Sequence, residues 1–436
     1  MNHKYFSFGS QPADGARSRV RDRAPLAPFL CATLVGIFSA AGTTASAQTS
    51  FKFDFSGGRP ESGWTAVAPT NFYSAEVGFG FEPGAKIITE NIKVSSVTST
   101  NPFYFSIKLP EGNYKVTVTL DEGSVTTIKS ELRRLMLERA LTAKGKTATR
   151  SFVCNVRTPN ISESNHVHLK QREQDTEMVD WDEKLTLEFN GAHPALRSLE
   201  IQKVDVPTIF IAGDSTVCDQ SGEPWNSWGQ MLPRFFKADV AVANYAESGE
   251  SIRSSLGAQR FAKIFSLMKK GDYLFVQFGH NDMKDKAPDA LETYKANLKK
   301  IVAETRAKGG TPVLVTSMER KGGVEHDTLA GYPDAVIEVA KAENCALIDL
   351  HAVSRIFYKA LGDDIGKAFQ DGTHHNNYGS YELAKCIING IRENKLPLAK
   401  SIADDFGNFA PAKPDDVNKF EMAVSPRGSR ITPLGN

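Results

Sequence analysis

The sequence has no excess of charge of either sign. Its 436 residues carry 52 Lys and Arg against 51 Asp and Glu, which gives a formal net charge of +1 at pH 7. Proteins that bind nucleic acid or an anionic membrane surface usually carry a basic face or tail, so this balance predicts neither partner. The content of 24% charged and 41% hydrophobic residues is typical of a folded protein and excludes a disordered chain.

Cysteine is also scarce. Cys31 falls in the N-terminal leader described below, and Cys154, Cys218, Cys345 and Cys386 remain. Four cysteines allow three pairings and their spacing favours none, so we expect free, buried thiols. The sequence contains no CxxC or Cys/His set typical of zinc, no P-loop and no GxGxxG motif, so we expect neither a metal nor a nucleotide cofactor.

Long apolar runs are missing except near the N-terminus. Arginines at 17, 19, 21 and 23 precede an apolar run over residues 28–41, and the small residues Ala45, Ser46 and Ala47 follow. The run is shorter than the ~20 residues of a membrane-spanning helix. We therefore predict that residues 1–47 are a signal peptide rather than an anchor, and that the mature protein is secreted or periplasmic and does not enter a membrane.

Residues 48–205 have the pattern of a β-sandwich. Alternating runs at 103–109 and 114–120 flank a turn at 110–113, which predicts a hairpin, and runs at 185–189 and 199–204 flank an Asn-Gly turn. Residues 130–143 have helical propensity, but we expect a strand because both flanking segments are β-patterned. Four aromatic residues, which we expect in the core although they could stack on sugar rings, are Trp64, Phe72, Tyr73 and Trp181.

Residues 206–400 alternate between apolar runs and amphipathic stretches. The apolar runs cover residues 208–212, 240–243, 273–278, 312–316 and 346–350, and the amphipathic stretches cover 227–236, 260–268, 291–308, 333–342 and 380–394. Five apolar strands separated by helices predict an α/β domain with a parallel sheet that is covered on both faces. Residues 401–436 are expected to form a C-terminal tail that packs on this domain or stays loose.

Polar residues follow the predicted strands and supply every group that acyl transfer needs. Ser215 follows the first strand and can act as nucleophile, with His374 as its base and Asp371 orienting the imidazole. The backbone N–H groups of Ser215 and Gly249 and the amide of Asn281 can form an oxyanion hole. Carboxyl ends of parallel strands meet at one edge of the sheet, so we expect these groups to converge there.

Each of these motifs also has a purely structural interpretation. A Gly-Asp-Ser-Thr segment can simply end a strand, and Asp371 can belong to a turn. His375 is a weaker candidate for the base because its offset breaks the Asp-x-x-His spacing, and we expect His280 to pack or hydrogen-bond at the pocket wall. His166 and His168 lack further ligands nearby in sequence, so a solvated strand is a better interpretation than a metal site.

The motifs, in their order, resemble the SGNH or GDSL hydrolase superfamily. The matching segments are Gly-Asp-Ser at 213–215, Gly249, Gly-His-Asn-Asp at 279–282 and Asp-Gly-Thr-His at 371–374. The resemblance implies a flavodoxin-like, three-layer fold and metal-free ester hydrolysis through an acyl-enzyme. Residues 244–254, 277–282 and 371–386 look like the rhamnogalacturonan acetylesterase branch, carbohydrate esterase family 12, in its two-domain bacterial form. This resemblance implies that the N-terminal β-sandwich is of galactose-binding-like type. Glu250 departs from this branch, in which a basic or small residue is common.

This resemblance implies a secreted serine esterase that removes O-acetyl groups from a plant cell-wall polysaccharide, most directly rhamnogalacturonan, without a cofactor. The expected partner is therefore an acetylated polysaccharide or oligosaccharide, and we expect a monomer. The residues that bind the glycan are not predicted. Other esters stay open, namely acetylxylan, an acetylated sialic acid or a lipid, as does a non-catalytic glycan-binding protein. Arg253 can bind an acidic sugar or pair with Glu247 or Glu250.

Overall fold

Two sheets, antiparallel except for the parallel pairing of β1 with β2, form the N-terminal part of the computed structural model, which describes residues 49–87, 96–426 and 433. The predicted signal peptide lies outside these residues. One sheet has the strand order β2-β1-β12-β6-β9 and the other β3-β5-β10-β7-β8, and β11 pairs with β4. The strands are β1 Ser50–Asp54, β2 Thr65–Ala66, β3 Phe79–Phe81, β4 Val97–Thr98, β5 Phe103–Lys108, β6 Gly112–Leu120, β7 Val125–Ser130, β8 Arg134–Leu141, β9 Ala148–Val156, β10 Lys184–Asn190, β11 Ala195–Leu196 and β12 Ser198–Lys203.

The core of this part lies between the two sheets, as expected of a β-sandwich. Phe53 and Val116 from one sheet and Phe105 and Leu187 from the other belong to one buried cluster. Aromatic rings dominate it, and Phe53 and Phe105 meet edge to face with centroids 5.4 Å apart. Burial alternates along β6, as its sequence pattern predicted, whereas β5 is buried on both faces except at its last residue.

The predicted hairpin of 103–109 with 114–120 is wrong. Strand β5 pairs with β3 and β10, whereas β6 pairs with β9 and β12, so the turn at 110–113 carries the chain from one sheet to the other. The Tyr114 hydroxyl donates a hydrogen bond to the Pro110 carbonyl at 2.7 Å and holds this crossover. Alternation reveals which face of a strand is buried but not which strand is its neighbour, which explains the error.

Most of the segment 130–143 is strand β8, as predicted against its helical propensity. Strands β7 and β8 pair antiparallel around the three-residue turn 131–133. Of the four aromatic residues, only Trp181 is buried, with 4% exposure, whereas Phe72 is 51% exposed. Trp64 and Tyr73 are partly exposed and carry the ammonium groups of Lys52 and Lys184 over their rings. Trp181 is buried in a cluster with Phe210 and Tyr245 and not between the two sheets, so the prediction that these four residues fill the sandwich core is wrong.

The C-terminal part is the predicted α/β domain with a five-stranded parallel sheet. Its strand order is β14-β13-β15-β16-β17, with all four pairings parallel, which is the flavodoxin-like order 2-1-3-4-5. The strand order reverses between β13 and β15, which are neighbours in the sheet. At such a reversal a ligand crevice is expected at the carboxyl ends of the two strands. The strands are β13 Thr208–Gly213, β14 Ala241–Asn244, β15 Tyr273–Gln277, β16 Thr311–Val315 and β17 Ala346–Ile348.

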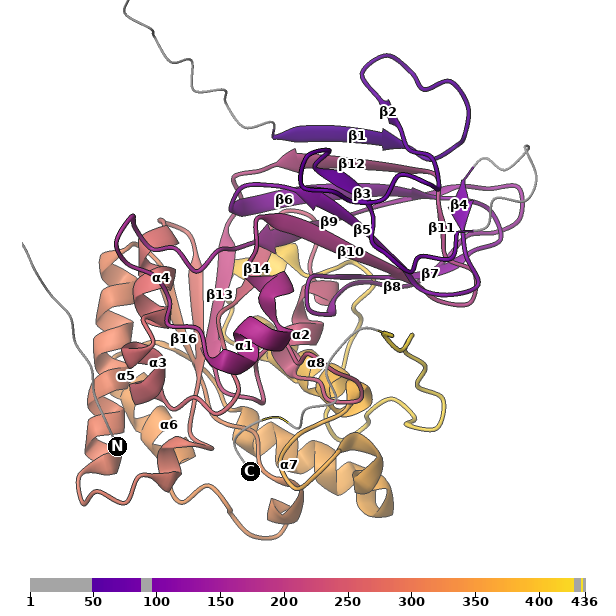
Figure 1. The fold of residues 1–436 in the computed structure, drawn as a ribbon. Coiled ribbons are helices and arrows are strands. Elements are labelled where there is room, and N and C mark those ends of the chain that lie inside the picture. Colours follow the sequence, from indigo (N-terminus) through magenta and orange to yellow (C-terminus); the bar gives the residue numbers. More distant parts are fainter. Residues whose placement is uncertain (1–48, 88–95, 427–432, 434–436) are drawn as a thin grey trace, which may run out of the picture. The chain divides into compact units, whose positions relative to one another are not determined.

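Helices cover both faces of this sheet, which makes the fold three-layered (Figure 1). Alternate residues along each strand enter different cores: Ile211 packs with α2, α7 and α8, whereas Phe210 packs with α3, α4, α5 and α6. The helices are α1 Gln171–Thr176 in the preceding part, then α2 Trp228–Met231, α3 Ile252–Gly257, α4 Arg260–Leu267, α5 Ala290–Ala307, α6 Tyr332–Ala342, α7 Leu350–Leu361 and α8 Asn377–Glu393, with 3-10 turns at Met178–Asp180, Leu232–Phe235, Asp282–Lys284, Lys321–Gly323, Gly362–Ala368 and Pro397–Ser401.

Helix α7 is missing from the prediction. The apolar run 346–350 suggested one strand, but the strand ends at Ile348 and the helix begins at Leu350. Asp349 caps this helix, because its carboxylate accepts a hydrogen bond from the Ala352 N–H at 3.1 Å. None of the helices in the described ranges is both long and apolar enough to cross a membrane.

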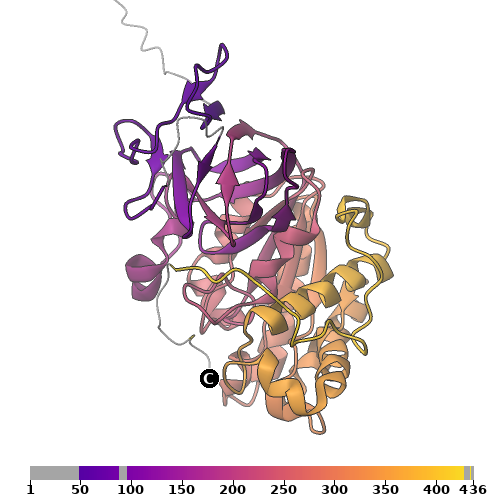
Figure 2. The ribbon, with the colours of Figure 1, turned by 90° about the vertical axis from the view of Figure 1, so that its right-hand side faces the viewer.

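The segment after Ser401 joins the two parts. Phe420 packs its ring against Tyr378 and Tyr381 of α8, and the chain then continues to the β-sandwich, as the yellow segment in Figure 2 shows. There the ammonium of the buried Lys129 donates to the Ala423 carbonyl at 2.6 Å and to the Ser425 hydroxyl at 2.8 Å. The described part of the predicted C-terminal tail, up to residue 426, thus contacts both the α/β domain and the β-sandwich.

Candidate active site

Ser215, His374 and Asp371 form one continuous hydrogen-bonded chain. Ser215 follows β13, and the other two residues belong to the turn that precedes α8. His374 Nε2 lies 2.7 Å from Ser215 Oγ, and His374 Nδ1 lies 2.8 Å from Asp371 Oδ2. A carboxylate can only accept, so Nδ1 carries the proton and Nε2 accepts the hydrogen bond from the serine hydroxyl. This is the geometry of a serine activated by a base.

The turn itself fixes the carboxylate of Asp371. Its Oδ1 accepts hydrogen bonds from the backbone N–H groups of Thr373 and His374, both at 2.7 Å, while Oδ2 faces the imidazole. Asn376 then caps α8 by accepting from the Gly379 N–H at 3.1 Å. The Asp-x-x-His spacing matters because a single turn sets the position of both side chains.

The buried carboxylate of Asp214 fixes the loop after β13. Asp214 Oδ1 accepts from the Thr216 backbone N–H at 2.9 Å and from the Thr216 hydroxyl at 2.7 Å, and His280 Nδ1 lies 3.4 Å from Oδ2. Burial would raise the pKa of Asp214, but the charge and hydrogen bond of His280, together with Thr216, lower it overall. His280 Nε2 also donates to the Met318 carbonyl at 3.0 Å. His280 is thus a buried, hydrogen-bonded residue behind the loop, in agreement with the hydrogen-bonding role that was expected.

Three N–H donors gather at the same edge of the sheet. The backbone N–H groups of Ser215 and Gly249 have no hydrogen-bond partner among the residues that the structure describes. Gly249 has φ +76°, a conformation that costs a side chain energy and suits glycine. The Asn281 amide donates one hydrogen bond to the Glu250 carbonyl at 3.0 Å and accepts one from Lys284 Nζ at 3.3 Å, which fixes its orientation.

His375 does not take part in this chain. Its Nε2 lies 2.8 Å from the Tyr358 hydroxyl, and its ring packs on Phe369 with centroids 4.1 Å apart. Burial lowers the pKa of His375 to about 3, so this imidazole stays neutral. The structure therefore assigns the contact with Ser215 to His374, as the Asp-x-x-His spacing indicated.

Possible metal ligands gather elsewhere. Within the described residues, groups of three occur at Glu319, Asp327 and His351 and at Glu173, Glu177 and Glu247, and neither includes His166 or His168. Arg172 pairs with Glu177 at 2.8 Å, and Arg260 pairs with Glu173 at 2.5 Å. Arginine cations thus already neutralise the buried group.

The two acidic neighbours of Gly249 do not hold Arg253. Arg253 is 76% exposed at its side chain and lies 3.6 Å from Asp285, so neither pairing considered from the sequence forms. Glu250, which differs from the residue common in the acetylesterase branch, is buried and pairs with Lys170 at 2.8 Å. This pairing explains how an acidic side chain is tolerated beside Gly249.

Two cations beside the site were missed in the sequence. Arg320 follows β16 and donates to the Thr373 hydroxyl at 3.2 Å, next to His374, and to the His280 carbonyl at 3.4 Å. Lys284 contacts the amide of Asn281. Burial first, and then the charge of Arg320, lower the pKa of Lys284, which shows that the two cations are close enough to interact. Their positions after β16 and β15, at strand ends, were the available signal.

Two protein families match parts of the chain. Residues 211–380 match the GDSL-like lipase/acylhydrolase family, and residues 51–159 match the galactose-binding-like domain of β-agarase/YxiM-type esterases, which confirms the predicted type of the β-sandwich.

Relatives and solved structures cover one or both parts. The chain is 36% identical over 213 residues to the rhamnogalacturonan acetylesterase RhgT of Bacillus subtilis, which covers 44% of this chain and 91% of RhgT. It is 24% identical over 371 residues to the uncharacterized esterase YxiM of the same organism, over 79% of this chain and 91% of YxiM. The crystal structure of YxiM superposes with a TM-score of 0.44 at 23% identity, over 80% of this chain and 99% of that one. This chain belongs to the GDSL-like lipase/acylhydrolase family and is a carboxylic ester hydrolase.

Proposed function

We propose that the protein is a serine acetylesterase that removes O-acetyl groups from a plant cell-wall polysaccharide, with rhamnogalacturonan as the substrate. The observation that carries the proposal is the chain Ser215–His374–Asp371, with its 2.7 Å and 2.8 Å contacts. The proposal includes action outside the cytoplasm after removal of residues 1–47, as the leader pattern predicts.

The reaction has two halves. His374 Nε2 takes the proton of Ser215 as Oγ attacks the acetyl carbonyl, and the same imidazole then gives that proton to the departing sugar oxygen. This leaves an acetyl group on Ser215. Water, deprotonated by His374, attacks the acetyl-serine, and acetate leaves as the serine recovers its proton. Asp371 stabilises the imidazolium that forms in each half.

The backbone N–H groups of Ser215 and Gly249 and the amide of Asn281 stabilise the tetrahedral intermediates. The two backbone donors are without partners in the described structure, and an amide retains a second N–H after its hydrogen bond to the Glu250 carbonyl. Preorganised donors of this kind lower the barrier because they need no reorientation as the oxyanion develops.

The choice of rhamnogalacturonan rests on charge. Arg320 and Lys284 flank the candidate site on the sides of His374 and Asn281. Rhamnogalacturonan carries a carboxylate on every galacturonate unit, whereas the xylan backbone is neutral, so two cations beside the scissile ester favour the acidic polymer. The relative RhgT, named as a rhamnogalacturonan acetylesterase, supports the same choice.

The test is acetate release from acetylated rhamnogalacturonan and from acetylxylan, measured at low and high salt. We expect release from rhamnogalacturonan, with a KM that rises with salt as the ion pairs are screened. Ser215→Ala should lower kcat by several orders of magnitude without unfolding the protein, and an organophosphonate should label Ser215 only in the parent. Equal or better hydrolysis of acetylxylan would overturn the substrate, and an active Ser215→Ala variant would overturn the site.

A further inference from the structure

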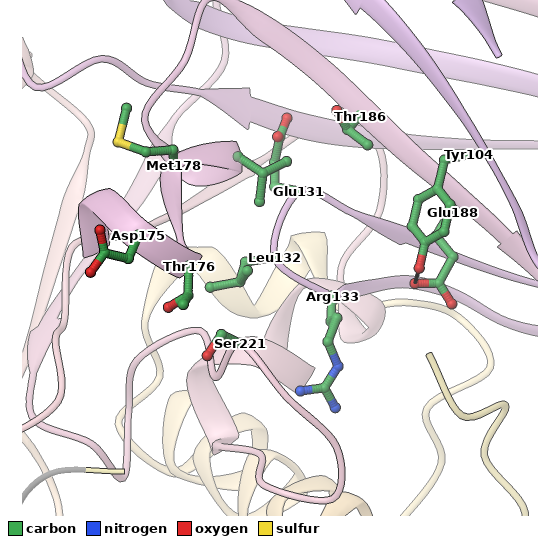
Figure 3. A pocket seen from close by; sticks show the side chains of 11 residues that line it. Tyr104, Glu131, Leu132, Arg133, Asp175, Thr176, Met178, Thr186, Glu188 and Ser221 are labelled. Atoms are coloured by element: carbon green, nitrogen blue, oxygen red, sulfur yellow. Dashed lines mark hydrogen bonds between the residues drawn. The ribbon is translucent and has the colours of Figure 1, made fainter. Parts of the chain in front are cut away.

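The turn between β7 and β8 of the β-sandwich lies against the loop that contains Ser215, residues 214–227. Figure 3 shows Leu132 and Arg133 of this turn and Ser221 of the loop around one cavity of about 480 Å³. Arg133 Nη1 donates to the carbonyls of Gln220 at 2.9 Å and Trp225 at 3.2 Å. The guanidinium therefore crosses from the sandwich to the α/β domain and binds the loop backbone directly.

A second donor ties the turn to the same carbonyl. Gln230 Nε2 of α2 donates to the Leu132 carbonyl at 2.6 Å and to the Gln220 carbonyl at 3.0 Å. Arg133 Nη2 also pairs with Glu223 of the loop at 2.9 Å. Residues 220–225 are thus held at two carbonyls and one carboxylate by groups that are almost completely buried.

The held residue Gln220 contacts the candidate nucleophile. Its side-chain Nε2 donates to the backbone carbonyl of Ser215 at 2.5 Å. A continuous path of two hydrogen bonds therefore runs from Arg133 to Gln220 and from Gln220 to Ser215. The peptide at its end carries the serine whose Oγ must stay within 2.7 Å of the imidazole.

An ion-pair network braces the loop from the same side. Arg134 Nε lies 3.1 Å from Asp219 Oδ2, and Asp180 bridges Arg134 and Arg157 at 3.0 Å and 2.9 Å. Asp219 Oδ1 in turn accepts from the amide of Asn244 at 2.9 Å. The side chains of this network are buried. Water therefore cannot replace a lost ion-pair or hydrogen-bond partner, and this restrains the geometry of the network.

The turn adopts an unfavourable backbone conformation to make these contacts. Glu131 has φ +52° and Arg133 has φ +67°, values that are uncommon for residues other than glycine. Each such residue costs energy and persists where surrounding contacts determine its conformation, which is most often at functional sites. The two left-handed residues flank Leu132, whose carbonyl is bound by Gln230.

We propose that the β-sandwich acts as an intramolecular clamp on the nucleophile, with Arg133 and Gln220 as positioning residues that set the backbone of Ser215. The inference rests on the proposed function in one respect, namely that Ser215 is the nucleophile. The clamp gives this domain a role in catalysis that needs no glycan on its surface. Loss of Gln220 removes its donor from the Ser215 carbonyl, and loss of Arg133 leaves the Gln220 carbonyl to Gln230, so either change loosens the Ser215 peptide. A misplacement of about 1 Å in an active site can cost about 100-fold in rate.

The experiment compares Arg133→Ala, Gln220→Ala and the double variant on p-nitrophenyl acetate, a substrate too small to reach the sandwich. Each single variant should lower kcat by about 10- to 100-fold and change KM by less than about twofold. The double variant should be no slower than the slower single variant, because both substitutions break one path. Arg139→Ala is the matched control, since this arginine of β8 is 47% exposed at its side chain and should keep parental kcat.

Two outcomes overturn the clamp. One is a kcat within twofold of the parent for both single variants, with Ser215→Ala inactive; the proposed function then stands without the clamp. The other is a double variant whose losses multiply, which would show independent effects. If Arg133→Ala fails to fold because Glu223 loses its nearest cation and keeps only Lys129 at 3.5 Å, Gln220→Ala decides alone, since it removes one donor within the α/β domain. Activity in Ser215→Ala would instead refute the proposed function itself.

Discussion

Asp282, the residue after Asn281, offers a quantitative test of the buried electrostatics beside the candidate site. It is 6% exposed, and its Oδ1 accepts a hydrogen bond from the Ile252 N–H at 2.9 Å. Its Oδ2 has no hydrogen-bond partner within the described residues. Burial raises the pKa of Asp282 to about 7, so the folded protein keeps this carboxyl protonated under mildly acidic conditions.

The sign of the resulting pH dependence follows from linkage. In the unfolded chain the carboxyl has a pKa near 3.9 and loses its proton below pH 5. Between pH 5 and pH 8 the unfolded state therefore binds fewer protons than the folded state, and stability falls as pH rises, levelling off above the folded pKa. With one pKa unit equal to about 1.4 kcal/mol, this group alone removes about 2–3 kcal/mol of unfolding free energy over that interval.

Asp282→Asn imitates the protonated side chain and retains an oxygen that can accept from Ile252. We expect the unfolding free energy of the variant, relative to the parent, to rise by about 2–3 kcal/mol from pH 5 to pH 8 in urea titrations. Asp285→Asn is the matched control, because Asp285 is 40% exposed at its side chain, and its difference from the parent should stay flat. A difference for Asp282→Asn that is constant within about 0.5 kcal/mol would refute the reasoning.

Three other substitutions test the hydrogen-bonded residues Ser215, His374 and Asp371 and their surroundings. Asp371→Asn should lower kcat by about 10³–10⁴-fold with the fold intact, because an amide cannot stabilise the imidazolium; steady-state kinetics and circular dichroism measure both effects. His375→Gln should keep kcat within about tenfold of the parent but lower the melting temperature, since it loses the packing around Tyr358. Gly279→Ala should cost about 1–3 kcal/mol in urea unfolding, because φ is +151° and the new Cβ would lie 2.7 Å from Ser317 Oγ.

The parts of the site that were predictable from sequence are those set by short-range geometry. Asp371 and His374 share one turn, so their spacing alone indicates an oriented imidazole. Ser215, Gly249 and Asn281 follow apolar runs, and a parallel sheet brings such positions to one edge whatever the loops do. The fold class was predictable for the same reason, since each apolar run of the α/β domain became a strand, although the last one ended early where α7 begins.

The contacts that were not predictable depend on which strands are neighbours. Arg133 reaches Gln220 only because β8 lies at an edge of its sheet and the turn before it takes left-handed conformations, neither of which leaves a periodic signal. The wrong hairpin at 110–113 has the same origin. Arg320 lies beside His374 through a loop conformation after β16, and strand-end position alone does not distinguish it from any other loop arginine.

The change of pattern near Val206 marks a change of secondary structure but not an end to packing. Leu135 of β8 is buried in the same cluster as Ile209 and Ile211 of β13, on one face of the parallel sheet. Trp181, from the segment before β10, belongs to the cluster on the other face and meets the ring of Tyr245 with centroids 5.8 Å apart. The sandwich thus contributes side chains to both cores of the α/β domain, and the described residues belong to one compact unit. Because these side chains would be exposed on separation, the apolar packing and the polar contacts to residues 214–227 stabilise the same arrangement. Both therefore restrain the edge of the sheet that carries the candidate site.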